Sequence, residues 1–124
     1  MHFNKARQEL ALAKDIDEVK DIRDKAEALR AYAKQAGYSL EMQNQCAEIK
    51  IRAERKAGEL LPEQITIGGS GPKSHDATLK DLDIKKDQSV RWQSIASIPE
   101  DKFEEHIKEV LESKEELQTL MARI

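Results

Sequence analysis

The residues best suited to chemistry lie in the segment KKDQSVRWQSIAS, residues 85–97. If this segment is a helix turning by about 100° per residue, a polar stripe faces away from Trp92. The stripe combines long polar and small side chains at positions i, i+4, i+7 and i+11: Lys86, Val90, Gln93 and Ser97. In a DNA major groove, lysine pairs with guanine, glutamine pairs with adenine, and valine can contact the thymine methyl group. The segment therefore predicts a helix that can read base pairs.

Trp92 is expected to anchor this helix rather than to stack on bases. It falls on the face opposite the polar stripe, and we expect it to pack against Leu79, Leu82 and Ile84. Basic side chains near the stripe are expected to contact DNA phosphates: Lys80, Lys85 and Arg91. The alternative interpretation is the solvated polar face of a plain helical bundle, because such faces are common.

Other residue clusters do not have the spacing of a catalytic or metal site. The three histidines lie in separate segments: His2, His75 and His106. Cys46 stands alone in an apolar stretch, where a buried small residue is expected. The sequence GGSGPKS differs from a phosphate-binding loop because Pro72 stands where glycine must precede lysine. We therefore expect no enzyme activity, no catalytic residue, no metal and no cofactor.

Length and composition favour an all-α protein with one domain or two small helical units. Of 124 residues, 36% are charged and only 4% are aromatic, so the core must consist mainly of Ala, Leu and Ile. The formal net charge of −3 argues against a general polyanion binder but leaves room for a local basic face. A single cysteine and the lack of a long apolar run predict a soluble, cytoplasmic protein without membrane contact.

Two long helices with an alanine-rich apolar stripe are predicted in the first half. Gly37 is a natural left-handed stop for the first, Ser39 can cap the second, and Pro62 closes it. The apolar positions alternate in steps of three and four: Val19, Ile22, Ala26, Leu29, Ala33 and Ala36, then Met42, Cys46, Ile49, Ala53, Ala57 and Leu60. Because few residues join them, these helices must form a coiled-coil-like antiparallel hairpin roughly 30 Å long.

A shorter helix over residues 4–14 is expected before the hairpin, with Leu10 and Leu12 packing back onto it, and Asp15 or Asp17 can cap the next helix. Alanine buries little area, so the hairpin needs the C-terminal half or a second copy of the chain for stability. We expect a homo-oligomer, in the simplest case a dimer that forms a four-helix bundle. The predicted interface is drawn from the apolar stripes: Ile22, Ala26, Leu29, Ala33, Met42, Ile49, Ala53 and Leu60.

The chain is predicted to have three parts. They are a helical hairpin over residues 1–61, a flexible Gly/Pro linker over 62–76, and a small helical unit over 77–124. The last unit is expected to contain helices at 79–82, 86–97, 99–111 and 114–123. Thr78 can cap the first of them, and a turn at Asp83–Ile84 separates it from the second. A short helix, a tight turn and a second helix are typical of a helix-turn-helix.

Two segments carry a resemblance to a known class of proteins. TLKDLDIKKDQSVRWQSIASIPEDKFEEHI and DIRDKAEALRAYAKQAGYSLEMQNQCAEIKIRAERKAGELL resemble small phage and mobile-element proteins related to the helix-turn-helix of ParB-like DNA-binding proteins. The resemblance covers most of the chain outside the linker and implies a helical architecture of that origin. Where the pattern has glycine in the turn, this chain has Asp83, which tolerates a left-handed conformation. A ParB-type nucleotide-binding motif is not visible, so partition activity is not implied.

These observations lead to two hypotheses and a third with less support. The first is a phage or mobile-element protein that dimerises through its hairpin and binds duplex DNA with residues 85–97. The second is an interaction protein that binds and modulates a host protein. Residues 99–124, with eight acidic and four basic side chains, or the flank of the hairpin would then form the contact. The third is a subunit of a larger nucleoprotein complex.

Overall fold

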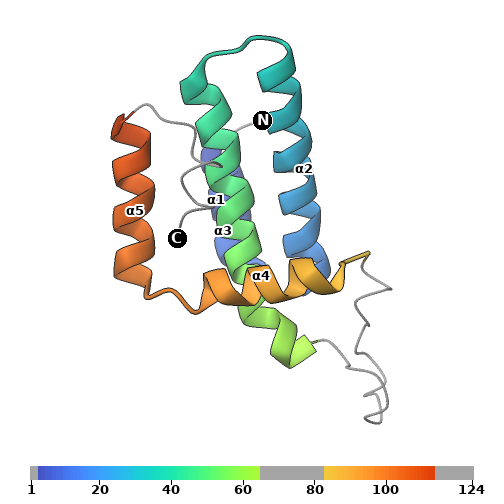
Figure 1. The fold of residues 1–124 in the computed structure, drawn as a ribbon. Coiled ribbons are helices and arrows are strands. Elements are labelled where there is room, and N and C mark those ends of the chain that lie inside the picture. The colour runs from blue at the N-terminus through green and yellow to red at the C-terminus, as the bar shows by residue number, and fades with distance from the viewer. Residues whose placement is uncertain (1–2, 65–82, 114–124) are drawn as a thin grey trace.

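The computed structural model describes residues 3–64 and 83–113, and both parts are helical (Figure 1). Within these residues there is no strand, so the predicted all-α class is confirmed. The described helices are α1 (Phe3–Leu12), α2 (Ile16–Gln35), α3 (Leu40–Gln64), α4 (Lys86–Ala96) and α5 (Glu100–Ser113).

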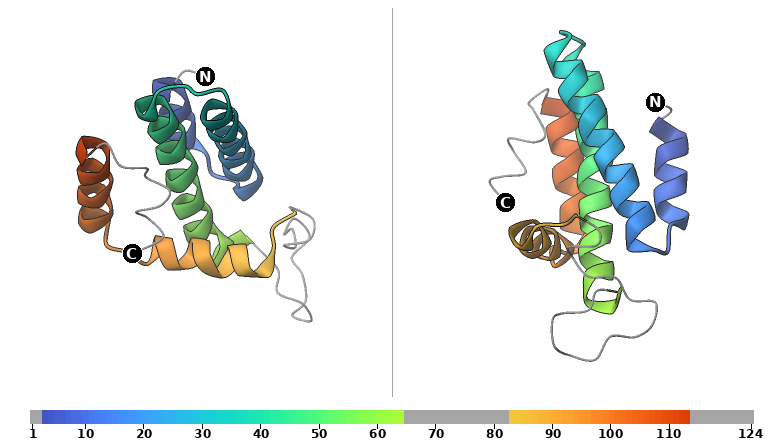
Figure 2. Two further views of the ribbon diagram at one scale, coloured as in Figure 1. Left: turned by 45° about the horizontal axis from the view of Figure 1, so that its top comes forward. Right: turned by 90° about the vertical axis from the view of Figure 1, so that its right-hand side faces the viewer.

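The bundle is organised around α3, which contacts each of the other described helices. α2 runs antiparallel to α3, α5 lies along another side of it, and α4 crosses it near its C-terminal end (Figure 1, Figure 2). The main hydrophobic core draws side chains from α1, α2, α3 and α4, together with Ile84. A smaller core joins α3 to α5: Ala47, Ile51, Phe103 and Ile107. The predicted hairpin and the following helical unit therefore pack together through α3.

The turn between α2 and α3 contains both of the features predicted for it. Gly37 has a φ of 76°, in the left-handed region that glycine favours. The backbone N–H of Tyr38 donates to the carbonyl oxygen of Ala33 at 2.9 Å and so closes the end of α2. Ser39 Oγ accepts a hydrogen bond from the backbone N–H of Met42 at 3.2 Å. A left-handed glycine and a serine cap thus set where the chain reverses.

Some helix ends differ from the predicted ones. α1 ends at Leu12, and this side chain is 78% exposed, so the prediction that it packs back is wrong; Ala13 takes the buried position instead. Asp15 occupies the position before α2, but its side chain makes no capping hydrogen bond. α3 continues through Pro62 to Gln64. Proline removes one backbone hydrogen bond near the end of the helix without stopping it there.

The position of α4 depends on a close approach at Gly58. A Cβ atom at Gly58 would lie 2.0 Å from the carbonyl oxygen of Trp92, so the two backbones meet where a side chain cannot fit. Asp83 has a φ of 55° in the turn before α4, which agrees with the expected left-handed conformation. The backbone N–H of Lys85 donates to Gln88 Oε1 at 3.0 Å and caps the start of α4. The predicted helix at 79–82 lies outside the described residues.

Candidate nucleic-acid interface

Trp92 faces the inside of the protein, as predicted. It is 1% exposed and belongs to the main core, which also contains Ile84. The other two residues expected to pack against it, Leu79 and Leu82, lie outside the described residues. The indole therefore anchors α4 and is not available for stacking on a base.

The opposite side of α4 is exposed. Val90 is 61% exposed on this side. The whole predicted polar stripe lies on this side: Lys86, Val90, Gln93 and Ser97. Of the side chains predicted to contact phosphates, Lys85 and Arg91 are exposed, and Lys80 lies outside the described residues. The residues that helical spacing grouped together thus share one accessible surface.

Hydrogen bonds in α4 and at its C-terminal cap restrain two side chains of this surface. The Nε2 atom of Gln93 donates to Ser89 Oγ at 3.1 Å, and the hydroxyl of Ser97 donates to the carbonyl oxygen of Ser94 at 2.6 Å. Asp87 is also exposed on α4, so this helix carries an acidic as well as a basic side chain at its start. Sequence reasoning missed the role of Ser89, although its spacing of four residues from Gln93 is the signal for such a bond.

Arg91 lies next to a buried carboxylate that sequence reasoning did not identify. Its side chain is 60% exposed, and its Nη2 atom is 4.0 Å from Oε1 of Glu54, which is 1% exposed. This Oε1 atom has no hydrogen-bond partner among the described residues. The other oxygen, Oε2, accepts a hydrogen bond from Arg23 Nε at 2.9 Å, and the Arg23 guanidinium lies 5.4 Å from the centre of the Trp92 ring. Glu54 and Arg23 thus support the buried face of α4.

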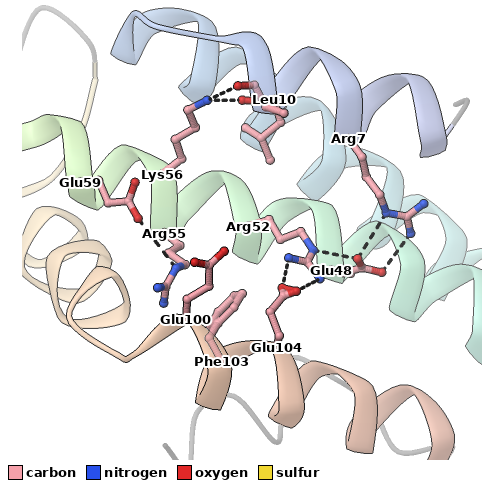
Figure 3. Close-up of a pocket in the computed structure, with 11 residues that line it drawn as sticks. Arg7, Leu10, Glu48, Arg52, Arg55, Lys56, Glu59, Glu100, Phe103 and Glu104 are labelled. Carbon is pink, nitrogen blue, oxygen red and sulfur yellow. Dashed lines mark hydrogen bonds and ion pairs between the residues drawn. The ribbon is translucent and has the colours of Figure 1, made fainter.

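A cleft of about 410 Å³ lies between α1, α3 and α5 (Figure 3). Glu48 is buried in its wall and accepts hydrogen bonds from Arg7 Nη2 at 3.0 Å and Arg52 Nε at 2.8 Å. Arg52 also pairs with Glu104 on α5, and the ammonium of Lys56 donates to the carbonyl oxygens of Leu10 and Ala11 on α1. Burial disfavours the charged form of Glu48, but the hydrogen bonds from Arg7 and Arg52 outweigh it and lower its pKa.

The charges in this cleft balance one another. Four basic and four acidic side chains line it: Arg7, Arg52, Arg55 and Lys56, with Glu48, Glu59, Glu100 and Glu104. The Arg55 guanidinium donates to the carbonyl oxygen of Ile95 and lies 4.6 Å from the centre of the Phe103 ring. An added anion would have to displace these partners. The arrangement is suited to joining the helices.

A third ionic group joins α2 to α3, and it makes the free energy of unfolding depend on pH in the acidic range. Glu27 Oε1 is 2.8 Å from Arg30 Nη2, and its Oε2 is 2.8 Å from Lys50 Nζ. Burial disfavours the charged form of Glu27, but hydrogen bonds from Arg30 and Lys50 prevail and lower its pKa to about 2 from 4.5.

Because this pKa is depressed in the folded state, the charged carboxylate stabilises the protein fully above its unfolded pKa of 4.5. That contribution is lost as the pH falls toward about 2. We therefore expect the wild type to lose more free energy of unfolding than Glu27→Gln over this range, measured by urea titration. Parallel losses in both proteins would contradict this assignment.

The predicted oligomer interface lies largely inside a single chain, which corrects the residue assignment. Its central members are buried within the chain: Ile22, Ala26, Ala33, Ile49 and Ala53. They cannot contact a second copy while α2 and α3 stay paired, because the apolar side chains of α2 pack against those of α3. Leu29 and Leu60 are half-buried, and only Met42 of this set is exposed. A homodimer stays a prediction, and it would need another surface.

Exposed apolar side chains collect at the end of the α2–α3 hairpin. We call this group the apolar tip; it consists of Tyr32, Tyr38, Leu40 and Met42. The rings of Tyr32 and Tyr38 meet edge to face with their centres 5.8 Å apart. Leu40 also lines a cavity of about 360 Å³ together with Leu111 of α5. Exposed apolar groups that lie together often mark a contact surface.

The remaining sequence candidates are placed as follows. Cys46 is buried, and this burial raises the pKa of its thiol, which makes it a poor nucleophile. His106 is half-buried on α5, whereas His2 and His75 lie outside the described residues. Across residues 3–64 and 83–113, His, Cys, Asp and Glu side chains form no group of three or more placed to hold a metal ion.

Among the described helices, none combines the length and the apolar character needed to cross a membrane. α3 is the longest of them, and it carries buried charges such as Glu48 and Glu54. No protein-family model matches the chain, and no curated protein or solved structure is significantly similar to it.

Proposed function

We propose that this chain is a non-enzymatic, helix-turn-helix type protein that binds duplex DNA by placing the exposed side of α4 in the major groove. The supporting observation is that Trp92 is buried while Val90, on the opposite side of the same helix, is 61% exposed. An α-helix with its side chains is about 10–12 Å wide, which suits a major groove about 12 Å wide. An anchored helix with an accessible polar side meets the first requirement of a reader helix.

Each side chain of the proposed reading surface then has a role set by its chemistry. Lys86 donates to guanine, Gln93 pairs with adenine, and Val90 contacts the thymine methyl group. Lys85, Arg91 and Lys80 contact phosphates, which fix the register of the helix without reading sequence. With a formal net charge of −3, the chain is not attracted to DNA as a whole, so binding depends on this local surface.

A second copy of the chain would complete the reader. One short helix contacts only a few base pairs, and helix-turn-helix proteins commonly reach useful affinity as dimers on two half-sites. Since most of the apolar stripes of α2 and α3 is buried within one chain, we assign the homodimer contact to the apolar tip, whose four side chains are exposed. A cytoplasmic location and an origin in a phage or mobile element belong to this proposal and rest on the sequence.

Substitutions on α4 separate sequence reading from phosphate contact. Gln93→Ala should remove the preference for one adenine, at a cost of about 1–3 kcal/mol on the preferred site. Arg91→Ala should weaken binding to every duplex and lower the slope of log K against log salt by about 1. Fluorescence anisotropy on matched and mismatched duplexes measures both effects.

Lys25→Ala, at an exposed position on α2, is the matched control and should bind like the wild type. Thermal unfolding of each variant checks that the fold is kept, which matters most for Arg91 because it neighbours Glu54. If Gln93→Ala shows the same preference as the wild type at every position, the proposed reading surface is wrong.

The apolar tip favours a second candidate function, an interaction protein that binds a host protein. Tyr32 and Met42 present exposed apolar area near the end of α2 and the start of α3. The turn between these two helices lies at the end of the hairpin away from α4 (Figure 1). In this case Met42→Lys should abolish capture of a defined partner from host lysate, whereas Gln93→Ala should leave that capture unchanged. The opposite pattern, or loss with both variants, would count against a partner at the tip.

A further inference from the structure

We propose that Ser89 is a positioning residue for Gln93 and that the pair thereby reads an A·T base pair. This inference rests on the proposed function and adds a residue that does not itself touch DNA. It is carried by one hydrogen bond, from Gln93 Nε2 to Ser89 Oγ at 3.1 Å, that links the buried and the exposed sides of α4.

Ser89 is fixed by its surroundings. It is 6% exposed and lies one turn before Trp92, on the side of α4 that packs against α3. Its backbone N–H donates to the carbonyl oxygen of Lys85 at 3.0 Å, within the first turn of the helix. The backbone bond fixes the Cα position, and burial restricts the rotamers of the hydroxyl, so a side chain bonded to it is held relative to the core.

The amide of Gln93 keeps the groups that adenine requires. A glutamine amide has two N–H donors and one carbonyl oxygen that can accept. The bond to Ser89 uses one donor and leaves one N–H and the oxygen on an exposed side chain. Adenine presents one acceptor, N7, and one donor, the N6 amino group, in the major groove. One remaining donor and one remaining acceptor match this pair.

If Ser89 holds the Gln93 amide in place before DNA binds, the preference for A·T over G·C should be stronger. A free glutamine loses rotamer freedom when it binds, and this loss offsets part of the gain from the two base contacts. Ser89 restricts the side chain before DNA arrives, so less freedom is lost on the correct base pair. Removing the hydroxyl should lower the preference for A·T over G·C at that position by about three- to tenfold.

The test uses the full chain and the duplex that the wild type selects from a random pool. For each position, the ratio of Kd values for the A·T and G·C versions is measured for wild type, Ser89→Ala, Gln93→Ala and Ser94→Ala. Ser94 is the matched control, because its hydroxyl donates to the carbonyl oxygen of Val90 at 3.0 Å and does not touch Gln93. Circular dichroism melting verifies that each variant is folded.

We expect Gln93→Ala to abolish the A·T preference at one position and Ser89→Ala to reduce it there. Both variants should bind the G·C version with the affinity of the wild type. Ser94→Ala should show the wild-type ratio at every position. If Ser89→Ala keeps the full wild-type ratio while Gln93→Ala loses it, the role of Ser89 is refuted and the proposed function stands. If the wild type binds DNA but Gln93→Ala changes no ratio, the reading of adenine is refuted. If the wild type binds no duplex at low salt, the proposed function itself fails, and this inference with it.

Discussion

Replacing Gly58 by alanine is expected to detach α4 from α3 and to destabilise the protein by about 3 kcal/mol. In an ordinary helix interior this change stabilises by roughly 1 kcal/mol, because alanine is the better helix former. At Gly58 the added Cβ atom would lie 2.0 Å from the backbone oxygen of Trp92 and 2.5 Å from its carbonyl carbon. Backbone atoms cannot rotate away, so the clash must be relieved by moving α4.

Trp92 is a convenient probe of this movement, since the chain contains one tryptophan and it is buried. For Gly58→Ala we expect a red-shifted emission maximum and a lower urea midpoint, with most of the helical circular dichroism retained. Gly37→Ala is the comparison, because its Cβ atom meets nothing within 4 Å and only the φ of 76° opposes it. That variant should cost about 1–2 kcal/mol and leave the emission unchanged. An unshifted emission in Gly58→Ala would contradict the close approach of the two helices.

Replacing Arg23 by methionine is expected to cost about 3–5 kcal/mol, because it leaves the buried Glu54 carboxylate without its bonded partner. Arg23 Nε lies 2.9 Å from Glu54 Oε2, and Glu54 is 1% exposed. Arg91 Nη2, 4.0 Å from the other oxygen, can compensate only in part. Chemical unfolding followed by circular dichroism gives the change in free energy.

Two further variants make this result specific. Lys25→Met breaks an ion pair on the same helix in which both side chains are more than half exposed, so it should change the free energy of unfolding far less than Arg23→Met. The double variant Arg23→Met, Glu54→Met should regain much of the loss, because paired apolar groups can replace a buried ion pair. A small effect for Arg23→Met, equal to that of Lys25→Met, would show that Glu54 does not depend on Arg23.

The local features of this fold could be predicted from the sequence because they act over a few residues. Helical periodicity alone decides that Val90 and Gln93 share a side away from Trp92. The backbone preference of glycine predicts Gly37 in the left-handed region, and the structure has it there. Asp83 also has a positive φ, which aspartate tolerates better than most residues, but its place in a turn was suggested by the resemblance. Such features are encoded within one or two turns of the chain.

Long-range pairings could not be predicted in the same way. Arg23 and Glu54 are 31 residues apart, and a chain with 36% charged residues offers many carboxylates for each guanidinium. The apolar stripes were similarly ambiguous, since a stripe such as Ile49 and Ala53 fits a helix of the same chain or of another chain equally well. Gly58 did carry a signal, because a glycine inside a helical pattern often marks a close packing contact.

The most direct measurement is binding of the full-length chain to a pool of random duplexes at low salt, followed by titration of the selected duplex with salt. If α4 reads DNA, a short motif with guanine and A·T positions should be enriched, and log K should fall linearly with log salt. Should the chain neither enrich any motif nor retain any duplex at low salt, the exposed side of α4 has no role in DNA recognition.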